Sequence, residues 1–273
     1  MSEERHRLAL DLVRAAGRMA QEGQARLAES PKAVVAKGPQ DFVTEMDLAV
    51  EDFLRERINA AFPDDDFLGE EAGPRPSRNG GGEFTWVVDP IDGTSNYMRG
   101  LEYWAVSVAC IRGDEPVLGA VWDGATARLY HARAGDRAFC EDSPLRPSTV
   151  TDPARALALL GSSGRGDFRS YLQLVERLHA RGLDYRRLGA AAPGILRVAS
   201  GQAEIFFEEH LNSWDALAAL AIAQAAGCVC TPVDERFIRA GGTVLVTSPA
   251  LPADIRGILA ADPAARRGTA TGR

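Results

Sequence analysis

The stretch Trp-Val-Val-Asp-Pro-Ile-Asp-Gly-Thr, residues 86–94, carries most of the information in this 273-residue chain. Its leading apolar residues predict a short buried strand that ends at Asp89, because Pro90 has no N–H to give to a strand ladder. The chain must then turn, so that Asp89 and Asp92 can face one point, with the carbonyl oxygen of Ile91 exposed between them. Oxygen donors gathered in this way are a candidate site for a hard divalent cation.

The two residues that follow favour an anion beside that cation. Gly93 lets the backbone approach a ligand closely, and a helix opening at Thr94 would offer free N–H groups to phosphate oxygens. An ordinary surface turn would explain an isolated Asp-Pro or Asp-Gly pair. The whole string directly after an apolar strand favours a functional site instead.

Three further acidic positions stand at the edges of expected elements, and each has a structural explanation of its own. The pair Glu70–Glu71 is by itself typical of a solvated face. Asp47 follows Thr44 by three residues before an apolar helix, which is the pattern of a capping box. Asp215 suits the positive N-terminal end of a helix that Ser213 could cap. Together with the central stretch, these acids favour a shared site.

The kind of ligand on offer favours magnesium or manganese over zinc. Magnesium takes oxygen donors octahedrally and keeps several waters, and two such ions roughly 4 Å apart can clamp the attacking and leaving oxygens of a phosphoryl transfer. The histidines are not at zinc-ligand spacing. They are His6, His131, His179 and His210.

Composition and charge describe an ordinary, mildly acidic globular chain. Hydrophobic residues make up 45% and charged residues 25%, and the formal net charge is −7. A broad positive surface for nucleic acid or anionic membrane is therefore not expected. No apolar run approaches the ~20 residues of a membrane span, and the charged N-terminus has no signal segment. We expect a cytoplasmic protein with reduced thiols and with neither nucleic acid nor membrane as partner.

Apolar periodicity predicts helices and strands in mixed order, with hairpin turns that indicate an antiparallel sheet. Residues 31–41 are rich in turn signals, residues 73–83 are typical of an exposed loop, and the tail after Ala261 is expected to fray. The coarse prediction is a layered α and β unit. Helices are expected over residues 8–27, 46–58, 170–180, 190–199 and 214–226, and strands over residues 84–88, 104–111, 117–122, 128–131, 203–207 and 243–247.

Three segments resemble the defining motifs of the inositol monophosphatase family, in the family's order and at similar separations. They are residues 69–71 (Gly-Glu-Glu), 86–97 (the central stretch through Thr-Ser-Asn-Tyr) and 214–215 (Trp-Asp), and residues 41–47 match a fourth segment. The resemblance covers about residues 5–250.

The resemblance implies an α+β fold, a layered α/β/α/β/α sandwich of the inositol monophosphatase and fructose bisphosphatase type. Such proteins are usually homodimers, so a homodimer is expected here. We expect a single domain over residues 1–262 whose two closely packed halves are roughly 1–150 and 151–262. Residues 263–273 are expected to be a disordered tail.

The resemblance also implies the ligands of two or three Mg²⁺ ions, for which Mn²⁺ could substitute. Glu70, Asp89 and the carbonyl of Ile91 would hold the first ion. Asp89, Asp92 and Asp215 would hold a second, and a weaker third ion would bind near Glu70.

Catalytic roles would fall to Asp47, Thr94 and Glu70. Asp47 and Thr94 would orient a metal-bound water and help to remove its proton before it attacks phosphorus. The phosphate would also rest on the backbone N–H groups of Gly93 and Thr94. Positioning and charge neutralisation carry such a transfer, with little covalent chemistry for the protein to do.

On the substrate side, the resemblance assigns Gly189, Ala190 and Ala191 to a stretch that contacts sugar or inositol hydroxyls. Ala190 stands where Ser or Thr is common, so one hydroxyl contact is absent. Glu208 matches an acid that precedes the last metal ligand. Lys37 resembles a family lysine with variable spacing, and a solvated loop lysine explains it equally well.

The implied activity is hydrolysis of a small phosphate monoester, with inositol monophosphate or a similar phosphorylated polyol as substrate and with inhibition by lithium. Fructose bisphosphate, histidinol phosphate and phosphoadenosine nucleotides are alternatives with the same chemistry. A different class of protein would be a catalytically silent relative that binds a metal or phosphate as a regulatory module. The presence of every required carboxylate favours the enzyme.

Overall fold

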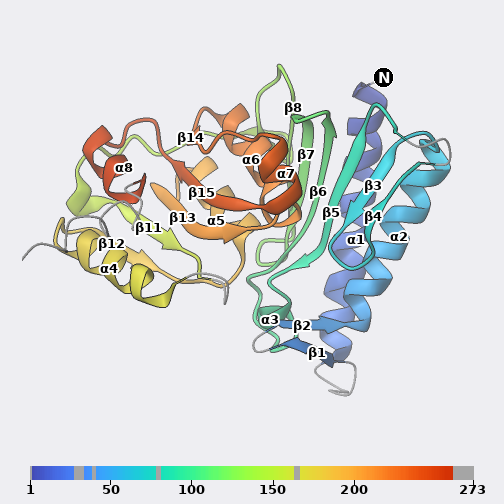
Figure 1. The fold of residues 1–273 in the computed structure, drawn as a ribbon, viewed down its shortest axis with the longest axis horizontal. Helices are drawn as coiled ribbons and strands as arrows, with labels where there is room; N and C mark the ends of the chain where they lie inside the picture. Colours follow the sequence, from blue (N-terminus) through green and yellow to red (C-terminus); the bar gives the residue numbers. More distant parts are fainter. Residues whose placement is uncertain (1, 28–33, 39–40, 78–80, 163–166, 261–273) are drawn as a thin grey trace, which may run out of the picture.

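Two mixed β-sheets, of eight and five strands, form the frame of the molecule within the part of the chain that the structure describes. The structure is a computed structural model and describes residues 2–27, 34–38, 41–77, 81–162 and 167–260. A separate ribbon pairs β1 (Val34–Gly38) with β2 (Asp41–Thr44). Helices lie between the two sheets and on their outer faces (Figure 1).

The first sheet has the strand order β10-β9-β8-β7-β6-β5-β3-β4 and is antiparallel except where β3 runs parallel to β5. Strands β5 to β8 are neighbours in sequence order. Tight hairpins join β6 to β7 and β7 to β8, as the turn signals predicted, and a longer segment, residues 93–104, joins β5 to β6. Its strands are β3 (Asp66–Gly69), β4 (Gly73–Arg75), β5 (Thr85–Asp92), β6 (Ala105–Arg112), β7 (Glu115–Asp123), β8 (Arg128–Arg133), β9 (Phe139–Cys140) and β10 (Ser143–Pro144).

The second sheet has the order β12-β11-β13-β15-β14, and β11 runs parallel to both of its neighbours. The remaining pairs are antiparallel. Its strands are β11 (Leu157–Leu160), β12 (Asp184–Arg186), β13 (Ile205–Leu211), β14 (Val229–Cys230) and β15 (Gly242–Thr247).

Helices and sheets alternate in the order α/β/α/β/α among the described elements, which confirms the expected α+β sandwich (Figure 1). The pair α1 and α2 covers one face of the first sheet, α5 and α6 lie between the sheets, and α4 and α8 cover the outer face of the second. Short helices complete the chain. The helices are α1 (Ser2–Leu27), α2 (Glu45–Ala61), α3 (Thr94–Tyr97), α4 (Phe168–His179), α5 (Ala191–Ala199), α6 (Ser213–Ala226), α7 (Glu235–Ala240), α8 (Ala253–Ala260) and the 3₁₀ turn η1 (Pro153–Arg155).

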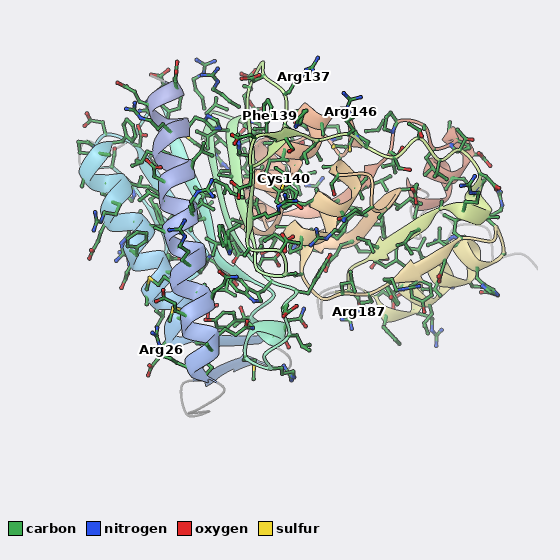
Figure 2. The ribbon with its side chains drawn as sticks, turned by 180° about the vertical axis from the view of Figure 1, so that it is seen from behind. Arg26, Arg137, Phe139, Cys140, Arg146 and Arg187 are labelled. Carbon is green, nitrogen blue, oxygen red and sulfur yellow. The ribbon has the colours of Figure 1, made fainter. Side chains whose placement is uncertain are left out.

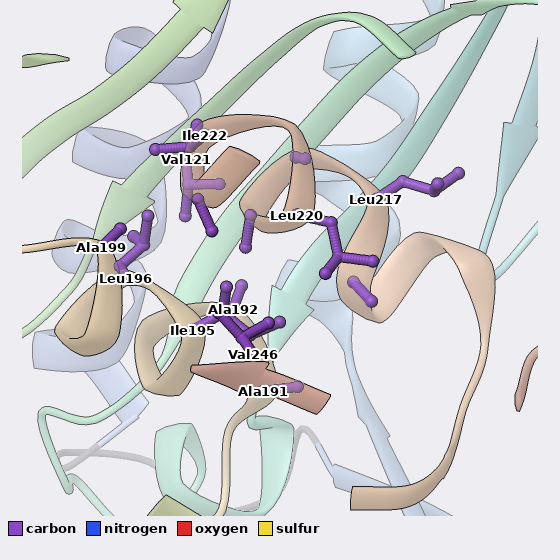
Figure 3. Packing of buried hydrophobic residues seen from close by; sticks show 14 of the residues in the cluster. Val121, Ala191, Ala192, Ile195, Leu196, Ala199, Leu217, Leu220, Ile222 and Val246 are labelled. Carbon is purple, nitrogen blue, oxygen red and sulfur yellow. The ribbon is translucent and has the colours of Figure 1, made fainter. Parts of the chain in front are cut away.

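The helix α6 is apolar on nearly every side because it lies between the two sheets. Leu217, Leu220 and Ile222 point in different directions and are all buried (Figure 3). The close fit to β7 depends on Gly119, where a Cβ would lie 2.3 Å from the carbonyl oxygen of Ala218. This middle layer joins the sheets and fixes the strand ends of the first one.

The strand β5 differs from the sequence-based expectation after Asp89, within the stretch that carries the candidate site. It does not turn away after Asp89 but continues through Pro90 to Asp92. Asp89 pairs with Ser107 and Asp92 pairs with Ala105, so the two residues between them oppose a single residue of β6. This is a β-bulge, which absorbs a proline without a ladder N–H and bends the strand.

Smaller differences lie elsewhere. The loop expected over residues 73–83 begins with strand β4, and the turn-rich residues 31–41 contain β1 and part of β2. The first helix begins at Ser2 rather than at residue 8. The expectations for residues 263–273 lie outside the described residues, and the division into halves stays a prediction. No helix among the described residues is long and apolar enough to cross a membrane.

A buried ion pair ties α1 to the segment that leads into β3. Arg5 donates to both carboxylate oxygens of Asp65, each at 2.7 Å, and Trp86 Nε1 donates to the same group at 2.9 Å. The guanidinium also lies over the rings of Phe62 and Phe84, 4.3 and 4.0 Å from their centroids. Removing one partner would leave the other charge buried, which is costly.

We therefore predict that Arg5→Met lowers the free energy of unfolding by about 3–5 kcal/mol. The matched control is Arg14→Met, because the Arg14–Glu141 pair has the same 2.7 Å separation but side chains 38% and 31% exposed. That change should cost no more than about 1 kcal/mol. Urea denaturation of both variants measures the difference, and equal losses would contradict this account.

Candidate functional site

Four carboxylates from distant parts of the sequence lie close enough for their charges to interact. The end of β5 supplies Asp89 and Asp92, the turn after β3 supplies Glu70, and the first turn of α6 supplies Asp215. The charges of the other three all raise the pKa of Asp89. The structure thus brings together the acids that the sequence singled out.

Asp89 is the centre of this group. Its side chain is 1% exposed, and its Oδ1 atom has no hydrogen-bond partner among the described residues. Burial, followed by the charges of Glu70, Asp92 and Asp215, raises the pKa of Asp89 well above its ordinary value. A buried carboxylate in such surroundings is unfavourable unless a proton or a cation neutralises it.

Asp92 is held by the first turn of α5. It accepts hydrogen bonds from the backbone N–H groups of Ala191 at 3.1 Å and Ala192 at 2.6 Å. Burial and the charge of Asp215 raise the pKa of Asp92 to about 7, although the two N–H groups act in the opposite direction. The residue thus connects the bulged end of β5 to the helix layer between the sheets.

Asp215 belongs to a capping box of α6, whereas the sequence analysis expected only a favourable interaction with the positive end of the helix and named Ser213 as a possible cap. Its Oδ2 atom accepts the N–H of Asn212 at 2.8 Å, and the Asn212 side chain caps α6 in return. Ser213, proposed as the cap, is instead the first residue of the helix. The cap places the Asp215 side chain at the helix end that faces the strand ends of the first sheet.

Asp47 combines a cap with a contact to the central stretch. Its Oδ2 atom accepts the N–H of Thr44 at 2.8 Å and also the Thr44 hydroxyl, which closes a capping box for α2. Its Oδ1 atom accepts the Thr94 hydroxyl at 3.0 Å, and that hydroxyl is also 3.0 Å from the carbonyl oxygen of Ile91. Burial raises the pKa of Asp47, and the hydrogen bonds from both threonines oppose this.

Glu51 is a site residue that the sequence analysis missed. It is 2% exposed and accepts the N–H groups of Glu71 at 2.8 Å and Ala72 at 2.7 Å, so it holds the turn that carries Glu70. A Cβ at Gly69 would lie 2.4 Å from a Glu51 oxygen, so only glycine allows this approach. The available signal was an acid four residues after Asp47, on the same face of an apolar helix.

The expected substrate segment adjoins the central stretch. A Cβ at Gly93, whose φ is +90°, would lie 2.9 Å from the Cβ of Ala190. Asn96, a second residue without an assigned role, donates to the carbonyl oxygens of Tyr103 and Leu188, each at 2.8 Å. Asn96 therefore clamps the segment that contains Gly189 beside the end of β5.

Glu208 stands apart from the metal-type carboxylates, on β13 of the second sheet. It is 8% exposed, and a Cβ at Gly161 would collide with its carboxylate. Arg187 donates to the carbonyl oxygen of Ser162 at 3.0 Å, which links this region to the expected substrate segment. Figure 2 shows Arg187 near the lower edge of the molecule, between the first and the second sheet. Lys37 lies in β1, and its side chain is outside the described residues.

The donor set fits a hard cation, although the side chains do not already surround one point. No three His, Cys, Asp or Glu side chains in the described parts of the chain converge as the ligands of an ion do. Like-charged carboxylates repel one another, so bringing them to ligand distance is favourable only when a proton or a cation neutralises part of their charge. The unpaired Oδ1 of Asp89 and the all-oxygen chemistry suit magnesium or manganese.

Comparison with known proteins identifies the family of this chain. The sequence model of the inositol monophosphatase family matches residues 1–271. The inositol-1-monophosphatase of Rhizobium meliloti is 37% identical over 198 residues, 71% of this chain and 73% of that protein. The fructose-1,6-bisphosphatase/inositol-1-monophosphatase of Aquifex aeolicus is 35% identical over 203 residues, 74% of this chain and 76% of that one.

The fold is also that of a solved structure. The extragenic suppressor protein suhB of Bartonella henselae superimposes with a TM-score of 0.85 over 93% of this chain and 97% of that chain, at 24% identity. The match of the family model over almost the whole sequence settles the membership. The chain belongs to the inositol monophosphatase family, whose members are phosphatases that hydrolyse phosphate monoesters and are generally metal-dependent.

Proposed function

We propose that this chain is a magnesium-dependent phosphatase that hydrolyses a small phosphorylated polyol, with inositol monophosphate as the leading candidate. The observation that carries the proposal is the buried carboxylate of Asp89, whose Oδ1 atom has no hydrogen-bond partner among the described residues. The negative charges of its neighbours Glu70, Asp92 and Asp215, and a hydrogen bond with Glu70, make its ionised form unfavourable in the metal-free protein. A cation is the ligand that such a group accepts most favourably.

The residues that would hold two or three Mg²⁺ ions, or Mn²⁺ in their place, are those at the end of β5 and their neighbours. Glu70, Asp89 and the Ile91 carbonyl form one set, and Asp89, Asp92 and Asp215 form the other. When bound, such ions neutralise phosphate charge and make water a better nucleophile at neutral pH.

Asp47 and Thr94 would act on the attacking water. Oδ1 of Asp47 and the Thr94 hydroxyl lie 3.0 Å apart, so a water between the site and this pair can be oriented by both. Burial raises the pKa of Asp47 and makes its carboxylate a stronger proton acceptor. Glu70, carried on the turn that Glu51 holds, would complete the catalytic group.

Substrate recognition would fall to the segment beside β5 and to the second sheet. The N–H groups of Gly93 and Thr94 would hold phosphate oxygens, and Gly189, Ala190, Ala191 and Glu208 would contact the leaving group. A methyl group at Ala190 in place of a hydroxyl favours a ligand that makes fewer polar contacts there. The double name of the Aquifex aeolicus relative keeps fructose bisphosphate as the second candidate substrate.

The remaining parts of the proposal rest on the resemblance. We propose that the protein works in the cytoplasm as a homodimer and that millimolar lithium inhibits it. Light scattering coupled to size-exclusion chromatography measures the oligomer, and lithium titration at fixed magnesium measures the inhibition. An enzyme that lithium does not inhibit would contradict the proposal of lithium inhibition and would leave the proposal of phosphatase activity unaffected.

A panel of phosphate esters with magnesium tests the activity directly. Inositol monophosphate, fructose bisphosphate, histidinol phosphate and phosphoadenosine phosphate are compared by phosphate release. We expect turnover with inositol monophosphate, and Asp89→Asn and Asp215→Asn should each reduce it by at least about a hundredfold. Asp114→Asn, an exposed acid at the β6–β7 turn, is the matched control. Magnesium binding without phosphate release from any ester would favour a regulatory module and reject the enzyme.

The same carboxylates should make the metal-free protein less stable as the pH rises. Burial raises the pKa of Asp92 to about 7 and that of Asp89 well above 3.8, so the folded state keeps protons that the unfolded chain releases. This contribution to stability is fully present below about pH 4 and falls as the pH rises; the part from Asp92 is lost once the pH has passed through about 7. Melting temperatures between pH 4 and 8, in chelator, should fall for the wild type and fall less for Asp89→Asn. Parallel curves would contradict the assignment.

Glu51→Gln should weaken the site through the turn that carries Glu70. A glutamine has one acceptor oxygen, so one of the two N–H groups that Glu51 accepts loses its partner, at about 1–3 kcal/mol. We expect lower stability together with a higher magnesium concentration for half-maximal activity. Glu56→Gln on the exposed face of α2 is the control. An unchanged magnesium requirement would show that Glu51 serves only the fold.

A further inference from the structure

The helix α5 is fixed at both of its ends to the first sheet, although it belongs to the second half of the chain. At its start, the N–H groups of Ala191 and Ala192 hold Asp92. Near its end, Arg197 forms an ion pair with Asp123 at the end of β7, with side chains 13% and 0% exposed. The motifs of the sequence analysis include neither member of this buried pair.

The distance along α5 between its two attachments matches the distance between the two aspartates on the first sheet. Asp92 pairs with Ala105, and Ala105 pairs with Asp123, so the two aspartates lie two strands apart. Two strand spacings are about 10 Å, and the five residues from Ala192 to Arg197 rise about 8 Å along a helix. The helix therefore lies across the strand ends and reaches one aspartate with each end.

Asp123 is itself held firmly. It accepts the N–H of Ala125 and the hydroxyl of Thr126, each at 3.0 Å, and the Arg197 guanidinium also lies 3.4 Å from the Tyr130 hydroxyl on β8. The guanidinium thus joins α5 to two neighbouring strands. A contact of this kind, largely desolvated and made by a rigid planar group, fixes the position of the helix that carries it.

The other side of α5 packs closely on the second sheet. At Gly194 a Cβ would lie 2.7 Å from the ring of Phe206 on β13, so a glycine at this position allows the helix to pack this closely against the strand. The Asp92 contacts fix the direction of the first turn of α5. The Arg197–Asp123 pair, about one and a half turns further along, is a second polar attachment that fixes the direction of the helix axis across the strand ends.

We propose that Arg197 is a positioning residue for the cation site: through α5 it sets the direction of the two N–H groups that orient the Asp92 carboxylate. The inference rests on the proposed function, because it takes Asp92 as a cation ligand. Outer contacts of this kind set how well a ligand is aimed and thereby the affinity for the metal. A purely structural ion pair would affect stability and leave cation affinity unchanged.

The test uses Arg197→Met combined with Asp123→Asn, which removes the pair without leaving a buried charge. The control is Arg181→Met with Asp254→Asn, which removes an exposed pair of 2.9 Å whose side chains are 49% and 63% exposed. The readout is the rise in melting temperature as Mg²⁺ is added without substrate, which gives an apparent dissociation constant. Activity as a function of magnesium is measured in parallel.

We expect the Arg197/Asp123 double variant to bind Mg²⁺ about tenfold more weakly, at the lower end of the effect of outer-sphere partners. Arg197→Lys should lie between the double variant and the wild type. In an Asp92→Asn background, removing the pair should change cation binding no further, because both changes act on one ligand. The control should stay within a factor of about two.

An Mg²⁺ dissociation constant of the double variant within twofold of the wild type would overturn the proposal, even if its melting temperature were lower. An additive loss in the Asp92→Asn background would overturn it as well. Failure of the phosphatase proposal would give a different result: the wild-type protein would bind Mg²⁺ but release no phosphate from any ester. The thermal titration does not depend on turnover, so it tests the role of Arg197 independently.

Discussion

The burial of like-charged carboxylates at the bulged end of β5 is the constraint on which the rest of the site depends. Asp89 is a buried residue of β5 in the first sheet, and its Oδ1 atom has no hydrogen bond from any described residue. Asp92 on the same strand, and Glu70 and Asp215 from two other segments, raise the electrostatic cost of ionising it. The folded state tolerates this electrostatic free energy because the backbone of β5, the capping boxes and the helix ends hold the carboxylates in place.

Much of this could be predicted from the sequence because the signals are local. The apolar strand before Asp89, the capping box at Thr44 and the helix predicted over residues 214–226 each depend on signals within a few residues of the structure they specify. The family resemblance then supplied the layering, which no local pattern contains. The error at Pro90 was also local in origin: a proline was taken as the end of a strand, although a bulge accommodates it.

The parts that could not be predicted are contacts between residues far apart in the chain. Glu51 accepts N–H groups 20 and 21 residues away, Asn96 reaches a carbonyl 92 residues away, and Arg197 pairs with an acid 74 residues away. Side chains of these types are usually solvated, and their own neighbourhoods give no reason to expect otherwise. Only the tertiary fold shows that they orient the turn, the loop and the helix around the site.

The capping boxes have a consequence for how relatives of this protein should be interpreted. Asp47 and Asp215 each complete the capping box of a helix as well as belonging to the candidate site, so a lineage that lost catalysis would still be selected to retain them. Asp89 begins no helix, and its burial opposes folding. Relatives that no longer need catalysis would therefore lose Asp89 first. Its replacement by a neutral residue is a more specific indicator of a pseudoenzyme than a change at Asp47 or Asp215.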